Sequence, residues 1–471
     1  MRLRLLAAAS LLAIALSTPA LAPAFADEER VGLDDQTAVA VTIYNQDLAL
    51  VRDARTITLA NGENDVAFID VSGHIQPQTA LLKSSAGKLD VLEQNFDFDL
   101  LTPQKLLEKS VGSTVRVIVT DRKGKETVEE AKVLSVADGV VLQIGDRIET
   151  QAPGRIVFAD IPPNLRSRPT LVTKIASDAA GKIPVELDYL TGGLSWAADY
   201  VAELSPDEKT IEIKGWVTLT NTSGTTYRNA KLQLVAGDVN RVRQQMVAGM
   251  AASTVVPMAA PAPMAEQALF EYHLYTLNRT TTIADNQTKQ VELLTGHGVP
   301  VTKEYHFYNL APGWNYQMGE APRVNASVRL KFVNTEKNNL GIPLPGGTVR
   351  VYKADNAGQA IFVGEDAIQH TPKNEYVDLT LGQAFDVTAR GKQTDFEKVA
   401  DDVFESAYSI EFKNAKSEPV TVILAQTVPG DWKMLEESQA SEKPDSSTAQ
   451  WHVTIPAEGS ATLTYRVRVK Y

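Results

Sequence analysis

Residues 462–471 read TLTYRVRVKY, and this stretch shows the pattern that decides the fold. Apolar or aromatic side chains occupy every second position, and polar or basic side chains lie between them. Successive side chains of a β-strand point to opposite faces of a sheet, so this alternation predicts a strand with one buried face and one solvated face. We expect a sandwich strand with a charged outer face rather than a strand of an outer-membrane barrel, which needs many ~10-residue strands in succession.

The same alternation recurs along the chain between turn signals such as Asn61-Gly62 and Ser223-Gly224. Helical patterns are scarce. They predict one short helix over residues 102–110, where Pro103 suits the first turn, and another over residues 395–405. The sequence therefore predicts an all-β protein, with strands over residues 39–44, 114–120, 209–220, 327–333, 348–352 and 420–425 among others.

The number of strands predicts several β modules in series, because a single hydrophobic core rarely grows beyond ~250 residues and this chain has 471. Tightly spaced strands predict a small barrel, and short strands near the C-terminus predict a sandwich. The predicted pieces are a signal peptide at 1–26, an N-terminal β module at 27–105, a small barrel-like β module at 106–165, a large β region at 170–405 with a flexible Ala/Pro/Met insertion at 247–268, and an Ig-like β-sandwich module at 406–471.

The first residues are organised like a secretory signal peptide. Two arginines precede an apolar run from Leu5 to Leu16, which is shorter than the ~20 residues that cross a bilayer. Ala24 and Ala26 form a small-residue cleavage site before an acidic stretch. We expect cleavage after Ala26, export to a bacterial periplasm and no lipoprotein anchor, because that anchor requires a cysteine and the chain has none.

Composition narrows the chemistry and the partners. The chain has 46 basic and 58 acidic residues, and a net charge of −12 repels nucleic acid on average, so we expect no nucleic-acid partner. No apolar run after the leader reaches spanning length, which predicts no transmembrane helix in the mature chain. The absence of cysteine excludes disulfides, cysteine zinc sites and thiol nucleophiles.

Residue spacing reveals no catalytic constellation. Residues 193–197 (GLSWA) superficially resemble a nucleophile elbow, but that motif joins a strand to a helix, whereas the flanking residues here predict strands. None of the six histidines belongs to an HExxH motif. We assign no catalytic, cofactor-binding or metal-binding residue and favour a protein that is not an enzyme. Paired carboxylates for glycoside hydrolysis stay open, because the fold sets their geometry.

Methionines raise a copper alternative in the predicted insertion. Met246, Met250, Met258 and Met264 lie in or beside it, and thioethers suit Cu(I). Copper-binding loops usually repeat methionine at tighter spacing with histidine nearby, and the nearest histidine here is His273. We interpret the segment as an adaptable linker and predict no cofactor.

Two classes of function follow from these observations. The first is a structural or interaction protein of the envelope, which would contact another envelope protein. The second is an envelope polysaccharide-binding or polysaccharide-active protein, motivated by export, acidic side chains and five tryptophans, although tryptophan is also common where two sheets pack. The predicted contact surface comprises the turns around Gly192, Gly193, Gly346 and Gly347, together with Trp196.

Several stretches of the second half share a recognisable pattern. They include VELDYLTGGLSWAADYVAEL at 185–204, LPGGTVRVYKADNAGQAIFVGED at 344–366 and LGQAFDVTAR at 381–390. From about Thr170 to the C-terminus, the chain resembles the bacterial family named only as domain of unknown function 4139, and also proteins loosely labelled mucoidy inhibitors. The resemblance implies β-sandwich modules and an envelope setting, and it supplies no catalytic residue that can be carried over.

Overall fold

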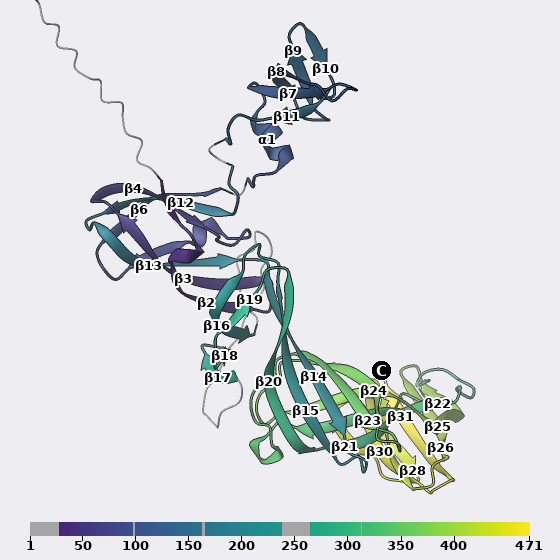
Figure 1. The fold of residues 1–471 in the computed structure, drawn as a ribbon. Coiled ribbons are helices and arrows are strands. Elements are labelled where there is room, and N and C mark those ends of the chain that lie inside the picture. Colours follow the sequence, from purple (N-terminus) through teal and green to yellow (C-terminus); the bar gives the residue numbers. More distant parts are fainter. Residues whose placement is uncertain (1–27, 98, 163–164, 238–263, 312) are drawn as a thin grey trace, which may run out of the picture. The chain divides into compact units, whose positions relative to one another are not determined.

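The protein is described by a computed structural model that covers residues 28–97, 99–162, 165–237, 264–311 and 313–471. Almost all its regular structure is β, which confirms the predicted class (Figure 1). The predicted signal peptide and residues 247–263 of the predicted insertion lie outside the described residues. None of the described helices combines the length and the apolar character that a bilayer crossing requires.

One of the two predicted helices is present. Helix α1 (Pro103–Lys109) begins after Thr102, whose side chain accepts a hydrogen bond from the backbone N–H of Lys105 at 3.1 Å. The helix predicted over 395–405 is wrong. These residues form the end of a hairpin between β25 (Tyr376–Ala400) and β26 (Val403–Asn414), because the ladder between the two strands satisfies their backbone groups.

The chain divides into two compact units that are each assembled from separated stretches. The first contains residues up to 37, 54–71 and 82–186, and the second contains residues 38–53, 72–81 and 187–471. The division therefore does not follow the predicted boundary near residue 105. Strands β2 (Gln36–Tyr44), β3 (Leu48–Leu59) and β13 (Gly181–Thr191) each run from one unit into the other.

The first unit contains a four-stranded sheet that residues after 169 complete. Its strand order is β1 (Glu29–Val31), β4 (Gly62–Ile69), β12 (Thr170–Ser177) and β6 (Leu89–Asp97). Because β12 lies between β4 and β6, both of its edges are hydrogen-bonded to strands of the predicted N-terminal module. Buried Arg55 donates hydrogen bonds to the carbonyl oxygens of Val31 and Ile69 at 2.8 and 2.7 Å.

Residues 114–157 form a second sheet of the first unit, with a small core of its own. The strand order is β10 (Arg147–Glu149), β9 (Val141–Ile144), β8 (Glu126–Ser135), β7 (Thr114–Thr120) and β11 (Arg155–Val157). The predicted small barrel is corrected to an open sheet. In the described residues, the two terminal strands are three residues long and pair only with β9 and β7.

An eight-stranded sheet connects stretches far apart in the sequence. Its order is β17 (Met264–Leu269), β18 (Tyr272–Leu277), β16 (Tyr227–Ala236), β2, β3, β13 and β5 (Leu81–Ser84), and β19 (Thr281–Ile283) also pairs with β16. The parallel pairing of β16 with β2 again crosses the predicted module boundary. Residues 264–268, predicted as the end of a flexible insertion, are instead part of β17.

The second unit contains a five-stranded sheet and a nine-stranded sheet. The first has the order β20 (Gln287–Pro300), β15 (Thr210–Asn221), β14 (Leu194–Leu204), β23 (Gly347–Ala354) and β24 (Ala360–Ile368). The second has the order β28 (Asp431–Glu437), β31 (Ser460–Lys470), β26, β25, β22 (Val324–Val333), β21 (Thr302–Tyr308), β27 (Val420–Thr427), β30 (Thr448–Ile455) and β29 (Glu442–Asp445).

The nine-stranded sheet folds back on itself as a β-sandwich. Trp451 of β30 stacks on Tyr465 of β31 with ring centroids 4.8 Å apart, although the two strands lie near opposite ends of the strand order. Both rings belong to one buried core. The predicted C-terminal sandwich is therefore present, but it begins at β21 rather than at residue 406, because β21, β22 and β25 supply the middle of its sheet.

Three buried asparagines close strand ends of the second unit in the same way. Asn221, Asn334 and Asn414 end or follow β15, β22 and β26, and none is more than 2% exposed. Each side-chain amide donates to two backbone carbonyls and accepts a hydrogen bond from one backbone N–H. We call this arrangement the asparagine corner. It satisfies buried backbone groups where the chain leaves a sheet.

Candidate functional site

Strand β14 brings the predicted contact residues together. Gly192 and Gly193 form the turn that precedes it, and Trp196 lies in its first half. Gly347 begins the neighbouring parallel strand and pairs with Ala198. One glycine turn therefore precedes β14, and the other begins the strand beside it.

The turn at Gly193 is a packing site rather than an exposed surface. Gly193 is buried, and its φ of 76° lies in the left-handed region that favours glycine. Its N–H donates to Asp47 Oδ1 at 2.8 Å, and its carbonyl accepts from the N–H of Thr222 at 2.7 Å. A Cβ atom at this position would lie 2.7 Å from the Cα of Ser223.

A cluster of hydroxyl groups surrounds this turn. The oxygens Ser72 Oγ and Thr191 Oγ1 are 2.5 Å apart, and Ser72 Oγ also donates to the Ser223 carbonyl at 3.2 Å. Ser223 Oγ lies 3.2 Å from Tyr227 Oη. All four side chains are buried, and burial raises the pKa of Tyr227 to about 12. These hydroxyls therefore hold backbone segments together and do not face solvent.

The second glycine turn is also fixed by its neighbours. A Cβ atom at Gly347 would lie 2.1 Å from the carbonyl oxygen of Ala198. Gly346 donates its N–H to His370 Nδ1 at 3.1 Å, and Tyr200 donates its hydroxyl to the Pro345 carbonyl at 2.8 Å. Gly346 and Gly347 are half-buried. The close approach of the Ala198 backbone explains why residue 347 is glycine.

The tryptophans serve packing in two sheets. Trp196 is 5% exposed and lies on β14, whereas Trp314 and Trp451 belong to the core of the sandwich. Trp216 and Trp432 are half-buried. Three of the five rings are therefore core residues, and the other two are partly exposed.

Two acidic residues of the β25–β26 hairpin are neutralised by arginines of β31. Glu405 is buried and lies 2.6 Å from Arg468 and 3.5 Å from Arg466. Asp395 is bound by Arg466 as well. This arrangement is typical of a charged sheet face whose side chains pair across neighbouring strands.

A partly buried ion-pair cluster lies on the outer face of the sandwich. On β21, Tyr305 and Phe307 point into the core, so the alternate residues Glu304 and His306 face away from it. His306 Nε2 and the Lys331 ammonium lie 2.6 and 2.7 Å from the same oxygen of Glu304. Burial disfavours the imidazolium and holds the pKa of His306 below its ordinary value of 6.5.

Neighbouring strands extend this cluster. Arg329 of β22 binds Asp378 of β25 at 2.6 Å and donates to the hydroxyl of Tyr308 at 2.6 Å. The Tyr308 ring stacks on His306 with centroids 5.8 Å apart. Each cation of the cluster has a carboxylate partner within 2.7 Å, so the arrangement stabilises the sheet face and leaves no unpaired cation for an anionic substrate.

Stability should depend on pH through His306. Its pKa is lower in the folded protein than in the unfolded chain, so the unfolded chain binds the proton more readily. The neutral ring therefore contributes stability above about pH 6.5, and this contribution is lost as the pH falls towards the lowered folded pKa. We expect His306→Gln to flatten the dependence of unfolding free energy on pH below about pH 6.5, measured by urea titration.

His297 offers a matched control for this measurement. It pairs with Glu212 at 2.6 Å, as His306 pairs with Glu304, but its side chain is 75% exposed. His297→Gln removes the imidazole of a similar pair at an exposed site, and it is therefore the control for loss of the pair itself. Equal flattening in both variants would contradict the assignment of the effect to burial.

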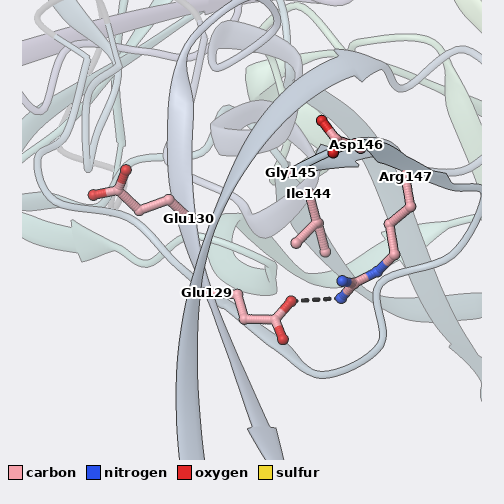
Figure 2. Close-up of a pocket in the computed structure, with 6 residues that line it drawn as sticks. All are labelled: Glu129, Glu130, Ile144, Gly145, Asp146 and Arg147. Atoms are coloured by element: carbon pink, nitrogen blue, oxygen red, sulfur yellow. Dashed lines mark hydrogen bonds and ion pairs between the residues drawn. The ribbon is translucent and has the colours of Figure 1, made fainter.

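The small open sheet of the first unit carries a shallow hollow at Glu129, Glu130, Ile144, Gly145, Asp146 and Arg147 (Figure 2). Arg147 crosses it and binds Glu129 at 2.5 Å, and it also binds Glu149 at 2.9 Å. Figure 2 shows Glu130 directed away from this pair. The single cation is therefore satisfied by two carboxylates. Within the described residues, no three His, Cys, Asp or Glu side chains are grouped to hold a metal ion.

The fold and the sites together define the class of protein. It consists of serial β-sheets and a β-sandwich, and the clustered polar side chains of the described residues stabilise its packing. The chain belongs to the family described as Domain of unknown function (DUF4139), whose model matches residues 185–471, more than half of the chain. The matched region coincides closely with the last stretch of the second unit, from residue 187 onwards. Comparison with curated proteins gave no match.

The asparagine corners were not identified from the sequence. Their sequence signal is a strand that ends in asparagine and continues into a turn, as in VTLTNTSG at 217–224, LKFVNTEK at 330–337 and IEFKNAKS at 410–417. A search for this recurrence would have found all three.

Proposed function

We propose that this protein is exported through its leader to the periplasm, where it acts as a non-enzymatic interaction protein of the cell envelope. The leader pattern of the sequence supports export. The packing roles of the hydroxyl cluster and the ion-pair clusters support a role other than catalysis.

One observation carries the interaction role. Ile361, Phe362 and Val363 of β24 are 50, 51 and 39% exposed. In the described part of the chain, no other three consecutive large apolar side chains are exposed. A run of exposed apolar residues on a sheet is costly in water unless another surface covers it, and such patches mark sites of protein–protein contact.

The test is chemical crosslinking in the native cell with the full chain carrying a C-terminal tag, followed by mass spectrometry of captured material. We expect the recovered chain to begin at Asp27 and to carry the same protein partner in independent preparations. A tagged chain without residues 1–26 serves as the control, and it should lose this partner because it is not exported.

Two results would contradict the proposal. Recovery of the protein from the cytoplasm with its leader intact would contradict the proposed export. Recovery of envelope glycan without any reproducible protein would replace the interaction role with the polysaccharide-binding alternative.

A further inference from the structure

The free edge of β24 gives the proposed interaction role a specific binding site. In the described residues, β24 ends the strand order of its sheet and pairs on one side only, with β23. An unpaired edge presents backbone N–H and C=O groups that can accept another strand. Residues 360–363 are all exposed, and we call them the β24 strip.

Other sheet edges of the protein carry residues that discourage pairing. The terminal strand β29 contains Glu442, Lys443 and Pro444. On the terminal strand β10, Ile148 lies between Arg147 and Glu149. Charged residues and proline at an edge are common protection against unwanted strand addition, and the β24 strip contains neither. A register shift in the pairing with β23 falls at Val363, the last residue of the strip.

The strip has defined ends. Beyond Val363, Gly364 lies against β25, since a Cβ atom there would be 2.2 Å from the carbonyl oxygen of Leu381. Asp366 accepts a hydrogen bond from the N–H of Thr380 at 2.7 Å. Before Ala360, the chain turns back to β23. Four residues of strand span roughly 13 Å, which suits a short extended peptide but is far smaller than the ~1,200 Å² that a stable subunit interface buries.

Charge favours a basic partner segment. Asp355 lies in the turn at one end of the strip. Asp366 lies at the other end beside Glu365, which pairs with Arg350 at 3.1 Å, and Arg350 is also bound by Asp199. Lys353, which pairs with Ile361 across the sheet, is neutralised by Glu208 at 2.5 Å. The two ends of the strip are therefore acidic, and opposite charges at the ends of an added strand stabilise its register.

Side chains of the strip also define the pattern that an added strand must have. The Phe362 ring packs against the Tyr352 ring of β23, with centroids 5.6 Å apart, so this pair forms an apolar platform on one face of the sheet. Ile361, the preceding residue of the strand, is exposed on the opposite face. Because alternate residues of an added strand share a face, apolar side chains at every second position would extend this platform.

We propose that residues 360–363 bind an extended segment of a partner protein, which adds to β24 as a sixth strand of the sheet. The segment has apolar side chains at alternate positions and lysine or arginine at both ends. This inference rests on the proposed interaction function and names its site and the chemistry of its partner. The binding mode is β-strand addition, in which backbone hydrogen bonds supply affinity and alternate side chains supply specificity.

The test uses the full chain and a fluorescein-labelled peptide, KKTVTVTVKK, in a fluorescence anisotropy titration. We expect saturable binding that weakens about fivefold when NaCl rises from 50 to 500 mM, because salt screens the end charges. The double variant Ile361→Lys/Val363→Lys should weaken binding at least about tenfold, because lysine on an edge strand opposes strand addition and repels the peptide. The control Ile148→Lys changes an exposed apolar residue of another edge strand and should bind like the wild type.

A second measurement does not depend on a variant. Hydrogen exchange of the wild-type chain should show that the peptide slows exchange in residues 360–363 and leaves β10 unchanged. The peptide KKTVPVPVKK, whose prolines lack the N–H needed for pairing, should give neither anisotropy change nor protection. Absence of wild-type binding up to about 1 mM peptide, or equal binding by the double variant, overturns the proposal.

The outcomes separate this inference from the proposed function. A protein partner that the double variant still captures in cells would leave the interaction function in place and refute the β24 strip. Peptide binding at β24 combined with recovery of glycan alone from cells would support the strip and refute the interaction function.

Discussion

Asn221→Ala should lower the free energy of unfolding of the second unit by about 4 kcal/mol. The substitution removes the hydrogen bonds that the buried amide donates to the carbonyls of Thr225 and Ile283, and the bond that it accepts from the N–H of Ser223. Each buried unsatisfied group costs about 1–3 kcal/mol. Urea unfolding followed by tryptophan fluorescence measures the change, and the same loss of corner bonds makes Asn334→Ala and Asn414→Ala destabilising.

Asn64 provides a matched control because it makes the same set of hydrogen bonds at an exposed site. Its amide donates to the carbonyls of Ala60 and Gly62 and accepts from the N–H of Ala60. Water can replace these partners, so Asn64→Ala should cost about 1 kcal/mol or less. An equally small effect for Asn221→Ala would show that burial is not what makes the corner important.

A charged side chain at position 221 should have a larger effect than alanine. In Asn221→Asp, a buried carboxylate would face two carbonyl oxygens, so its pKa would rise above that of the unfolded chain. The variant should therefore be less stable than Asn221→Ala at neutral pH and regain stability as the pH falls below the raised pKa.

Gly193→Ala should destabilise the protein by about 3 kcal/mol or more. A left-handed φ costs a residue with a side chain about 1–3 kcal/mol, and the new methyl group would also overlap the backbone of Ser223, with a Cβ to Cα distance of 2.7 Å. Thermal and urea unfolding measure the loss. The result would assign this residue to packing, whereas a stable variant with an altered partner would assign it to the contact surface that the sequence suggested.

Gly224→Ala separates strain from overlap. Gly224 has a φ of 80°, close to that of Gly193, but the nearest atom to an added Cβ would be 3.8 Å away. This variant should lose only about 1 kcal/mol, the part that comes from backbone conformation. Equal losses in the two variants would contradict the role of the Gly193–Ser223 contact.

The local sequence pattern was sufficient to predict a strand or a helix whose conformation depends mainly on its own residues. The alternation at 462–471 predicted β31, in which Leu463, Tyr465, Val467 and Val469 are buried. Thr102 and Pro103 predicted α1. The same reasoning failed at 395–405, because hairpin pairing with β26 outweighed a weak helical pattern.

Burial separates the predicted contact residues from the residues that the structure exposes. Gly193 and Trp196 looked accessible because glycine turns usually lie at the surface, but the segment around Ser72 packs against this turn. Conversely, Ile361 and Phe362 resemble core residues in the sequence and are exposed because β24 ends its sheet. No sequence pattern distinguishes an edge strand from a central one when both are apolar.

The sequence by itself determined the all-β class and many of the strands, because alternation with period two and turn chemistry act within a few residues. Its resemblance to the DUF4139 family was confirmed by the match over residues 185–471. Only the tertiary structure decided the strand orders, the interleaving of residues 28–97 with residues after 169, the asparagine corners and the free edge of β24. These features depend on hydrogen bonds between segments far apart in the chain, and a strand's own residues specify its two faces but not its neighbours.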